Sequence, residues 1–155
     1  MRPPAVDLDR IMAIMAAAFD PRFGEAWTRS QIEGALLLGN ARYRLIAQSG
    51  ALPGDGEAAA GFALTRCVLD EEELLLFAIV PDSRRRGLGG ALLGALIADA
   101  RRRGIRRMLL EMRAGNAAGS LYHAHGFRAV GRRPNYYRSA NGEAFDAITF
   151  SRTID

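Results

Sequence analysis

A run of arginines and glycines has the residue types and the spacing of an anion-binding loop. Ser83–Gly90 (SRRRGLGG) joins an apolar stretch to the expected start of a helix. Glycine lets the main chain turn tightly and approach a ligand, and the first amides of a helix have no internal acceptor. These amides, the helix dipole and forked guanidinium donors all favour a phosphate group. The segment is a candidate phosphate-binding loop, with a solvated arginine-rich turn as the alternative.

The glycine spacing argues against a dinucleotide-binding fingerprint. That fingerprint requires glycine or alanine three residues after Gly89, where Leu92 stands. It also follows a first strand, whereas this loop follows the third expected strand. The pattern is better written R-x-x-G-x-G, from Arg84 to Gly89.

Two further residues could move protons. Glu111 is a carboxylate inside the apolar run Met108–Met112, where a charge is costly unless it is paired or close to solvent. Tyr122 lies on a short expected helix. A carboxylate and a phenol can act as general base and general acid. The alternatives are an ion pair of Glu111 with Arg113 or another arginine, and plain core packing of Tyr122.

Alternating helices and strands must position these residues. Hydrophobic periodicity and turn residues predict helices at Asp7–Phe19, after the cap Thr28, at Gly87–Arg103 and at Asn116–His125. Strands are expected at Tyr43–Gln48, Ala58–Val68, Leu74–Val80, Ile105–Met112, Phe127–Val130 and Ala144–Phe150. Asp70–Glu73 is expected to be an acidic turn, and Arg132–Gly142 to join the last two strands.

The element order predicts an α/β fold whose mixed, mostly antiparallel sheet has helices on both faces. The first three strands can form an antiparallel meander. Leu74–Val80, the Gly87–Arg103 helix and Ile105–Met112 can form a parallel βαβ unit at its centre. Ligands bind beyond the carboxyl ends of such strands. We therefore expect the site between the Val80–Gly90 loop and Glu111.

Composition limits the possible classes of function. The chain has 155 residues, 49% of them apolar and 25% charged, which predicts one globular domain over residues 1–155. The net charge is +4 and the sequence contains no lysine, which excludes a Schiff-base lysine and a Walker-type loop. Cys67 is the only cysteine, so an intrachain disulfide and a cysteine metal cluster are excluded. His123 and His125 do not share a helix face, and we expect no metal site.

The sequence favours a cytoplasmic protein. No apolar run approaches the roughly 18 to 20 residues of a membrane helix. Asp7 and Asp9 precede the apolar stretch Ile11–Phe19, where an export signal would carry positive charge. An RNA-binding module is an alternative suggested by the pI of about 10.0. Aromatic residues do not interleave with the arginines, so no direct nucleic-acid binding is expected. The sequence carries no signal for an oligomeric state.

Two segments of the sequence resemble the motif of a known enzyme family. Ala78–Gly89 (AIVPDSRRRGLG) resembles the acetyl-coenzyme A motif of the GNAT N-acetyltransferases. Leu110–Asn116 (LEMRAGN), followed by Leu121-Tyr122 and Gly126-Phe127, is similar to the second half of that motif. The resemblance covers about residues 7–150 and implies a GNAT-like fold with acetyl-CoA as co-substrate.

Two segments narrow the resemblance. Arg132–Tyr137 (RRPNYY) and Ala26–Thr28 (AWT) are similar to the RimI-type members, which acetylate the N-terminal alanine of a ribosomal protein. A ribosomal-protein N-terminus is therefore the implied peptide substrate. The implied roles are general base for Glu111, general acid for Tyr122, main-chain contacts to the pantetheine arm for Ala78, Ile79 and Val80, pyrophosphate binding for Arg85, Arg86, Gly87, Leu88, Gly89 and Gly90, and a cofactor contact for Asn116. Trp27, Tyr136 and Tyr137 are candidate walls of a peptide groove, although Trp27 can equally anchor the first two helices.

These residue types suit acetyl transfer to an amine. The amine must be neutral, and because an α-amino group has a pKa of about 7.7 to 8.0, a modest base suffices. The departing thiolate benefits from a proton donor such as a tyrosine hydroxyl. A small-molecule amine is the alternative acceptor, and a sensor that binds acyl-CoA without catalysis is a further alternative.

Overall fold

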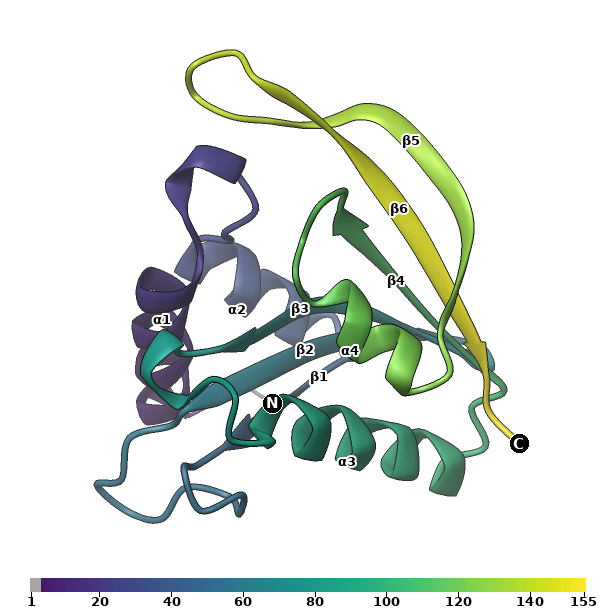
Figure 1. The fold of residues 1–155 in the computed structure, drawn as a ribbon. Helices are drawn as coiled ribbons and strands as arrows, with labels where there is room; N and C mark the ends of the chain where they lie inside the picture. The colour runs from purple at the N-terminus through teal and green to yellow at the C-terminus, as the bar shows by residue number, and fades with distance from the viewer. Residues whose placement is uncertain (1–3) are drawn as a thin grey trace.

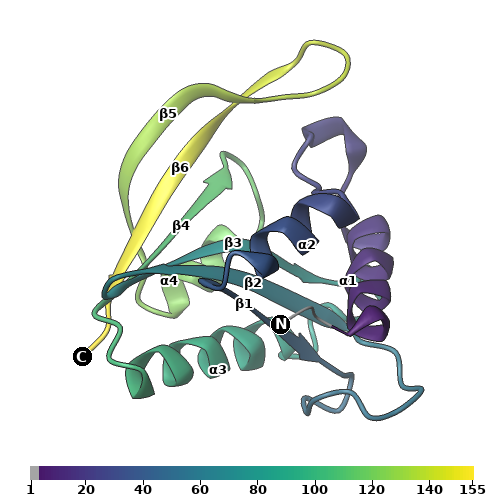
Figure 2. The same cartoon turned by 180° about the vertical axis from the view of Figure 1, so that it is seen from behind.

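Six strands form one sheet in the order β1-β2-β3-β4-β6-β5, and helices cover both of its faces (Figures 1 and 2). The computed structural model describes residues 4–155. Its elements are α1 (Ala5–Ala18), the short 3-10 helix η1 (Pro21–Phe23), α2 (Arg29–Leu37), β1 (Ala41–Ile46), β2 (Gly61–Val68), β3 (Glu71–Ile79), the 3-10 helix η2 (Pro81–Ser83), α3 (Leu88–Arg102), β4 (Arg107–Arg113), α4 (Gly119–Ala124), β5 (Arg128–Arg138) and β6 (Ala144–Thr153). The predicted fold class is confirmed.

The sheet has one parallel contact. β1, β2 and β3 form the predicted antiparallel meander, and β4 pairs antiparallel with β6, which pairs antiparallel with β5. β3 and β4 are parallel neighbours joined by α3, as the βαβ pattern predicted.

The parallel pairing covers only part of β3. Residues 71–74 pair with residues 107–110, and the last pair is Leu74 with Leu110. Beyond it β3 remains paired with β2 as far as Ile79, whereas β4 diverges from it (Figure 1). The side of β3 that faces β4 therefore presents main-chain groups of residues 75–79 without a strand partner. The divergence opens a wedge in the middle of the sheet.

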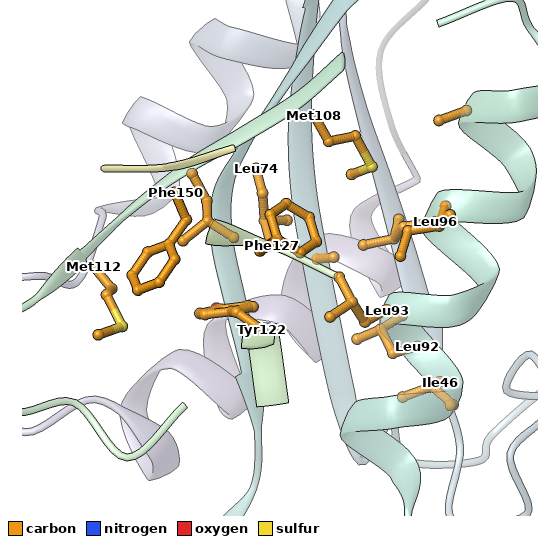
Figure 3. Packing of buried hydrophobic residues seen from close by; sticks show 14 of the residues in the cluster. Ile46, Leu74, Leu92, Leu93, Leu96, Met108, Met112, Tyr122, Phe127 and Phe150 are labelled. Atoms are coloured by element: carbon orange, nitrogen blue, oxygen red, sulfur yellow. The ribbon is translucent and has the colours of Figure 1, made fainter. Parts of the chain in front are cut away.

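Two hydrophobic clusters hold the layers together. One lies between the sheet and helices α3 and α4 and includes Leu92, Leu93 and Met108 (Figure 3). The other lies under α1 and α2 and includes Ile11 and Ile32. Side chains of β3 enter both clusters, as expected for an apolar strand that is covered on two faces.

The expected acidic turn at Asp70–Glu73 is wrong. Leu69 and Asp70 make the turn, and β3 begins at Glu71. Glu72 is only 1% exposed, and its carboxylate accepts hydrogen bonds from Arg103 Nη2 at 2.7 Å and Thr65 Oγ1 at 3.1 Å. Charge clustering favoured a solvated turn, but strand pairing with β2 points Glu72 inward, and Arg103 at the end of α3 neutralises it.

The expected connection at Arg132–Gly142 is also wrong, because most of it is strand. β5 spans Arg128–Arg138 and pairs with β6, with an irregularity in register between Arg133 and Tyr137. Pro134 and Asn135 lie in this irregularity, and Asn135 has a φ of 55°. Proline is tolerated there because β5 is an edge strand. The proline and the arginines gave this segment the composition of a loop.

Within residues 4–155, no helix combines the length and the apolar character needed to cross a bilayer.

We predict that Arg103→Ala lowers the free energy of unfolding by about 3 to 5 kcal/mol, because it leaves the buried Glu72 carboxylate without its counterion. Urea unfolding followed by circular dichroism measures this change. Arg102→Ala is the matched control, since that side chain is 68% exposed and its ion pair with Asp99 should contribute at most about 1 kcal/mol. Equal losses in the two variants would contradict the interpretation.

Candidate active site

The wedge between β3 and β4 opens into a cavity of about 520 Å³. Side chains of β3, β4, β5, α4 and the segment before α2 line it. Among them are the expected site residues Trp27, Glu111, Asn116, Tyr122, Tyr136 and Tyr137. Segments that are far apart in the sequence therefore meet at one place, beside the unpaired side of β3.

The arginine and glycine loop follows β3 directly and leads into α3. Arg84 is used by the fold, because its Nε donates a hydrogen bond to the Ile79 carbonyl oxygen at 3.1 Å. Arg85 and Arg86 are exposed. Arg85 has a φ of 63°, in the left-handed region that few non-glycine residues adopt. The main chain is thus bent sharply just before the helix begins.

Two glycines of this loop are required for different reasons. Gly87 caps α3 with a φ of 79°, a conformation that disfavours side chains, although a Cβ there would meet no neighbouring atom within 4 Å. At Gly89 a Cβ would lie 3.2 Å from Leu121 Cδ2, so this position lets α3 approach α4 closely. The first amides of α3 have no intrahelical acceptor, and they lie beside two exposed arginines. The loop therefore has the donors and the positive charge that a diphosphate requires.

Glu111 projects from β4 with its side chain 18% exposed. Its Oε1 lies 3.0 Å from Arg133 Nη2 on β5. The ion pair considered from the sequence is present, but its partner is Arg133 and not the adjacent Arg113. Because Arg133 is 59% exposed, solvent screens the pair and the carboxylate stays accessible from the cavity.

Tyr122 belongs both to the core and to the cavity wall. It is 6% exposed, and its ring packs edge-on against Phe77 with a centroid distance of 6.1 Å. It also packs edge-on against Phe127 at 6.0 Å (Figure 3). Burial, helped by the nearby negative charge of Glu25, raises the pKa of its hydroxyl well above the usual value. Tyr122 therefore keeps its proton at neutral pH, as a proton donor must.

Asn116 lies before α4 and not within it. The expected helix Asn116–His125 is too long, since α4 spans Gly119–Ala124. Asn116 Oδ1 accepts a hydrogen bond from the Ala118 amide at 3.0 Å, so the side chain shapes the turn that leads into the helix. It still lines the cavity.

The candidate peptide walls all line the cavity. Trp27 also packs against the cluster under α1 and α2, as its anchoring interpretation predicts. Tyr136 and Tyr137 contact each other edge-on, 5.2 Å apart. Burial and the charges of Glu25 and Glu111 raise the pKa of Tyr137 to about 12.

Sequence reasoning missed two carboxylates that line the cavity, Glu25 and Glu73. Glu25 precedes α2, and its side chain is 16% exposed. Arg113 Nε lies 3.3 Å from its Oε1, and Arg113 Cζ lies 3.6 Å from the centre of the Phe23 ring. Burial raises the pKa of the Glu25 carboxyl, while Arg113 opposes that shift. In the sequence, the nearby Trp27 was the only feature that indicated that the segment carrying Glu25 belongs to the site.

Comparison with known proteins identifies the family. A sequence model of the acetyltransferase (GNAT) domain matches residues 44–129 of this chain. The chain belongs to the GNAT acetyltransferase family. The [ribosomal protein bS18]-alanine N-acetyltransferase of Escherichia coli (strain K12) is 44% identical over 96 residues, which are 61% of this chain and 64% of that enzyme. The enzyme of the same name from Haemophilus influenzae is 38% identical over 91 residues, 59% of this chain and 62% of the relative. The matched segment thus spans less than two thirds of these curated relatives.

Solved structures extend the similarity to the complete fold. The crystal structure of the ribosomal-protein-S18-alanine N-acetyltransferase from Escherichia coli has a TM-score of 0.80 and 32% sequence identity, and the match covers 100% of this chain and 92% of that one. A phosphinothricin acetyltransferase from Sinorhizobium meliloti, solved in complex with AcCoA, shares the fold with a TM-score of 0.76 at 18% identity, over 99% of this chain and 86% of that chain. The family model and the solved structures thus confirm the resemblance to GNAT enzymes that the sequence showed.

The raised pKa of Tyr137 predicts a loss of stability in alkaline solution. An unfolded tyrosine ionises near pH 10, whereas Tyr137 in the folded protein holds its proton to about 12. Its contribution is complete below the unfolded pKa and is lost as the pH rises through the folded one. Urea unfolding over this range should show a falling free energy, with a shallower fall for Tyr137→Phe. Identical slopes would contradict the assignment.

Proposed function

We propose that this GNAT domain transfers the acetyl group of acetyl-CoA to the N-terminal α-amino group of a protein that begins with alanine, with a small-subunit ribosomal protein as the physiological substrate. One observation carries the proposal: β3 and β4 separate beyond Leu74 and Leu110, so that Glu111 and Tyr122 face one cavity beside an unpaired strand edge. The activity for which the Escherichia coli and Haemophilus influenzae relatives are named supports the choice of acceptor.

The chain offers a fitting site for acetyl-CoA, which supplies the acetyl thioester. The main chain of Ala78, Ile79 and Val80 would hold the pantetheine arm, because the end of β3 and the residue that follows it have no strand partner on the β4 side. The amides from Arg85 to Gly90, with the two exposed arginines, would hold the pyrophosphate. Asn116, which lies just before α4 and lines the cavity, would contact the cofactor.

Glu111 is assigned as the general base. An α-ammonium group must lose a proton before its nitrogen can attack, and its pKa of about 7.7 to 8.0 makes a carboxylate or a water held by one sufficient. Arg133 orients the carboxylate through the 3.0 Å ion pair, while its own exposure leaves a path for the proton to solvent.

Tyr122 is assigned as the general acid. When the carbon–sulfur bond breaks, the electron pair stays on sulfur, and a thiol pKa near 8.5 means that a proton donor assists its departure. Tyr122 holds its proton because it is buried, and the hydrophobic cluster fixes its ring at the cavity wall.

Thiol release is the direct test of the proposal. The protein is mixed with acetyl-CoA and a peptide that begins with alanine, and a thiol reagent measures product CoA. We expect release with this peptide and none with its N-terminally acetylated form. A panel of polyamines, amino acids and aminoglycosides serves as the comparison. Activity confined to that panel would assign the protein to small-molecule amines, and silence with every N-terminal peptide would defeat the proposed acceptor.

Tyr122→Phe should lower kcat by about 10²- to 10⁴-fold, the usual range for loss of a general acid, because the ring remains and only the proton donor is lost. Steady-state kinetics give kcat, and calorimetry with acetyl-CoA should show little change in Kd. Unchanged turnover would remove Tyr122 as the acid.

Glu111→Gln should flatten or shift the acidic limb of the pH–rate profile for kcat/KM, because the amide accepts no proton in this range. The profile is measured with the alanine peptide for both proteins. A profile that matches the unmodified protein would mean that another group, or bulk water, receives the proton.

A further inference from the structure

Glu111 and Glu25 reach the same cavity from different parts of the fold, and the third carboxylate that lines it, Glu73 of β3, pairs with Arg66 Nη2 at 2.8 Å. Glu111 comes from β4, and Glu25 comes from the segment between η1 and α2. The charges of both raise the pKa of Tyr137, so this ring lies within reach of each. The charge of Glu25 also raises the pKa of Tyr122. Glu25 therefore lies close to Tyr122 and Tyr137, two of the three tyrosines that line the cavity, and it has no role in the proton transfers assigned to Glu111 and Tyr122.

The fold fixes Glu25 in this position by several contacts. Gly24 has a φ of 64°, and a Cβ there would lie 2.7 Å from the Arg138 carbonyl oxygen, so the segment passes directly against β5. Phe23 contacts Phe145 of β6 edge-on at 5.2 Å. Arg22 Nη2 lies 2.9 Å from Glu143 Oε2. The segment that carries Glu25 is thus attached to the β5–β6 hairpin, as the close course of the two in Figure 2 illustrates.

The two carboxylates have different partners. Glu111 is paired with the exposed Arg133, whereas Glu25 is paired with Arg113, which is only 15% exposed. Arg113 contacts Glu25 through Oε1 at 3.3 Å, the longer of the two ion pairs. Burial raises the pKa of the Glu25 carboxyl, so its ionised form is disfavoured and a second cation would stabilise it. If this cation is an ammonium group, the aromatic faces of Trp27 and Tyr137 in the cavity wall can contact it as well, because aromatic faces attract ammonium groups.

We propose that Glu25 is the residue that binds the α-ammonium group of the acceptor peptide, and that Arg113 is the positioning residue that holds its carboxylate. The inference rests on the proposed function and names the contact by which the acceptor is recognised. An ammonium carries three donors, so Glu25 can hold the amine while Glu111 receives the proton. This arrangement separates recognition of the amine from its deprotonation.

Binding of two matched peptides tests the proposal without turnover. One peptide begins with alanine, and in the other a propionyl group replaces the alanine, which removes only the amino group. Calorimetry in the presence of CoA gives the Kd of each for the unmodified protein, for Glu25→Gln and for Glu33→Gln. Glu33 is the control, because it lies on α2 and pairs with Arg29 outside the cavity.

We expect the unmodified protein and Glu33→Gln to prefer the amino peptide by about ten- to a hundredfold, the usual worth of a hydrogen bond to a charged group. Glu25→Gln should lose most of this preference and still bind the propionyl peptide with unchanged Kd, which shows that the variant is folded. The KM for the alanine peptide should rise by a similar factor, while the Kd for acetyl-CoA stays constant.

Three outcomes decide the matter. Loss of the preference in Glu25→Gln alone supports the assignment. The role of Glu25 is overturned if the protein acetylates the alanine peptide but Glu25→Gln still prefers the amino peptide. It is also overturned if the unmodified protein shows no preference for the amino peptide. Both results leave the proposed function intact. Absence of thiol release with every N-terminal peptide overturns the proposed function, and the assignment of Glu25 with it.

Discussion

The end of the pairing between β3 and β4 is the constraint on which the site depends. As far as Leu74 and Leu110 the two strands share hydrogen bonds, and beyond that point each follows a different partner. An unpaired strand edge normally has to be satisfied by solvent or by a ligand. Here the gap exposes main-chain groups of β3 on one side and the Glu111 side chain on the other. Chemistry is possible at this place because the sheet is incomplete there.

Contacts at both ends of α3 hold the surroundings of this gap in place. Within the parallel stretch, Glu72 pairs with Met108 of β4, and its buried ion pair with Arg103 ties β3 to the end of α3. At the other end of α3, Gly89 lets the helix approach α4, which carries Tyr122. The two ends of one helix thus fix the closed part of the sheet and the wall of the cavity.

The sequence predicted those features that depend on local chemistry. Glycines at positive φ, the capping residue Thr28, and the apolar run of β3 each indicated their structure. Of the motif residues, Glu111, Asn116 and Tyr122 line one cavity, whereas residues 78–80 and 85–90 are not part of its lining. It could not predict partners brought together by tertiary packing. The pairing of Glu111 with Arg133 and of Glu25 with Arg113 depends on how β5 and the segment before α2 fold back, and no local pattern encodes that. Glu72 misled for the same reason, because strand register and not charge decided its burial.

β5 has a consequence for the behaviour of the protein in concentrated solution. It is an edge strand of eleven residues, nearly all exposed, and such a strand invites a second copy to add itself to the sheet. Four arginines, Pro134 and the irregular register at Asn135 lie along it. Charge repulsion between like edges, a missing amide donor and a distorted ladder all oppose such strand addition. Arg133, which also lines the cavity, thereby contributes to the protection of the protein from sheet-mediated aggregation.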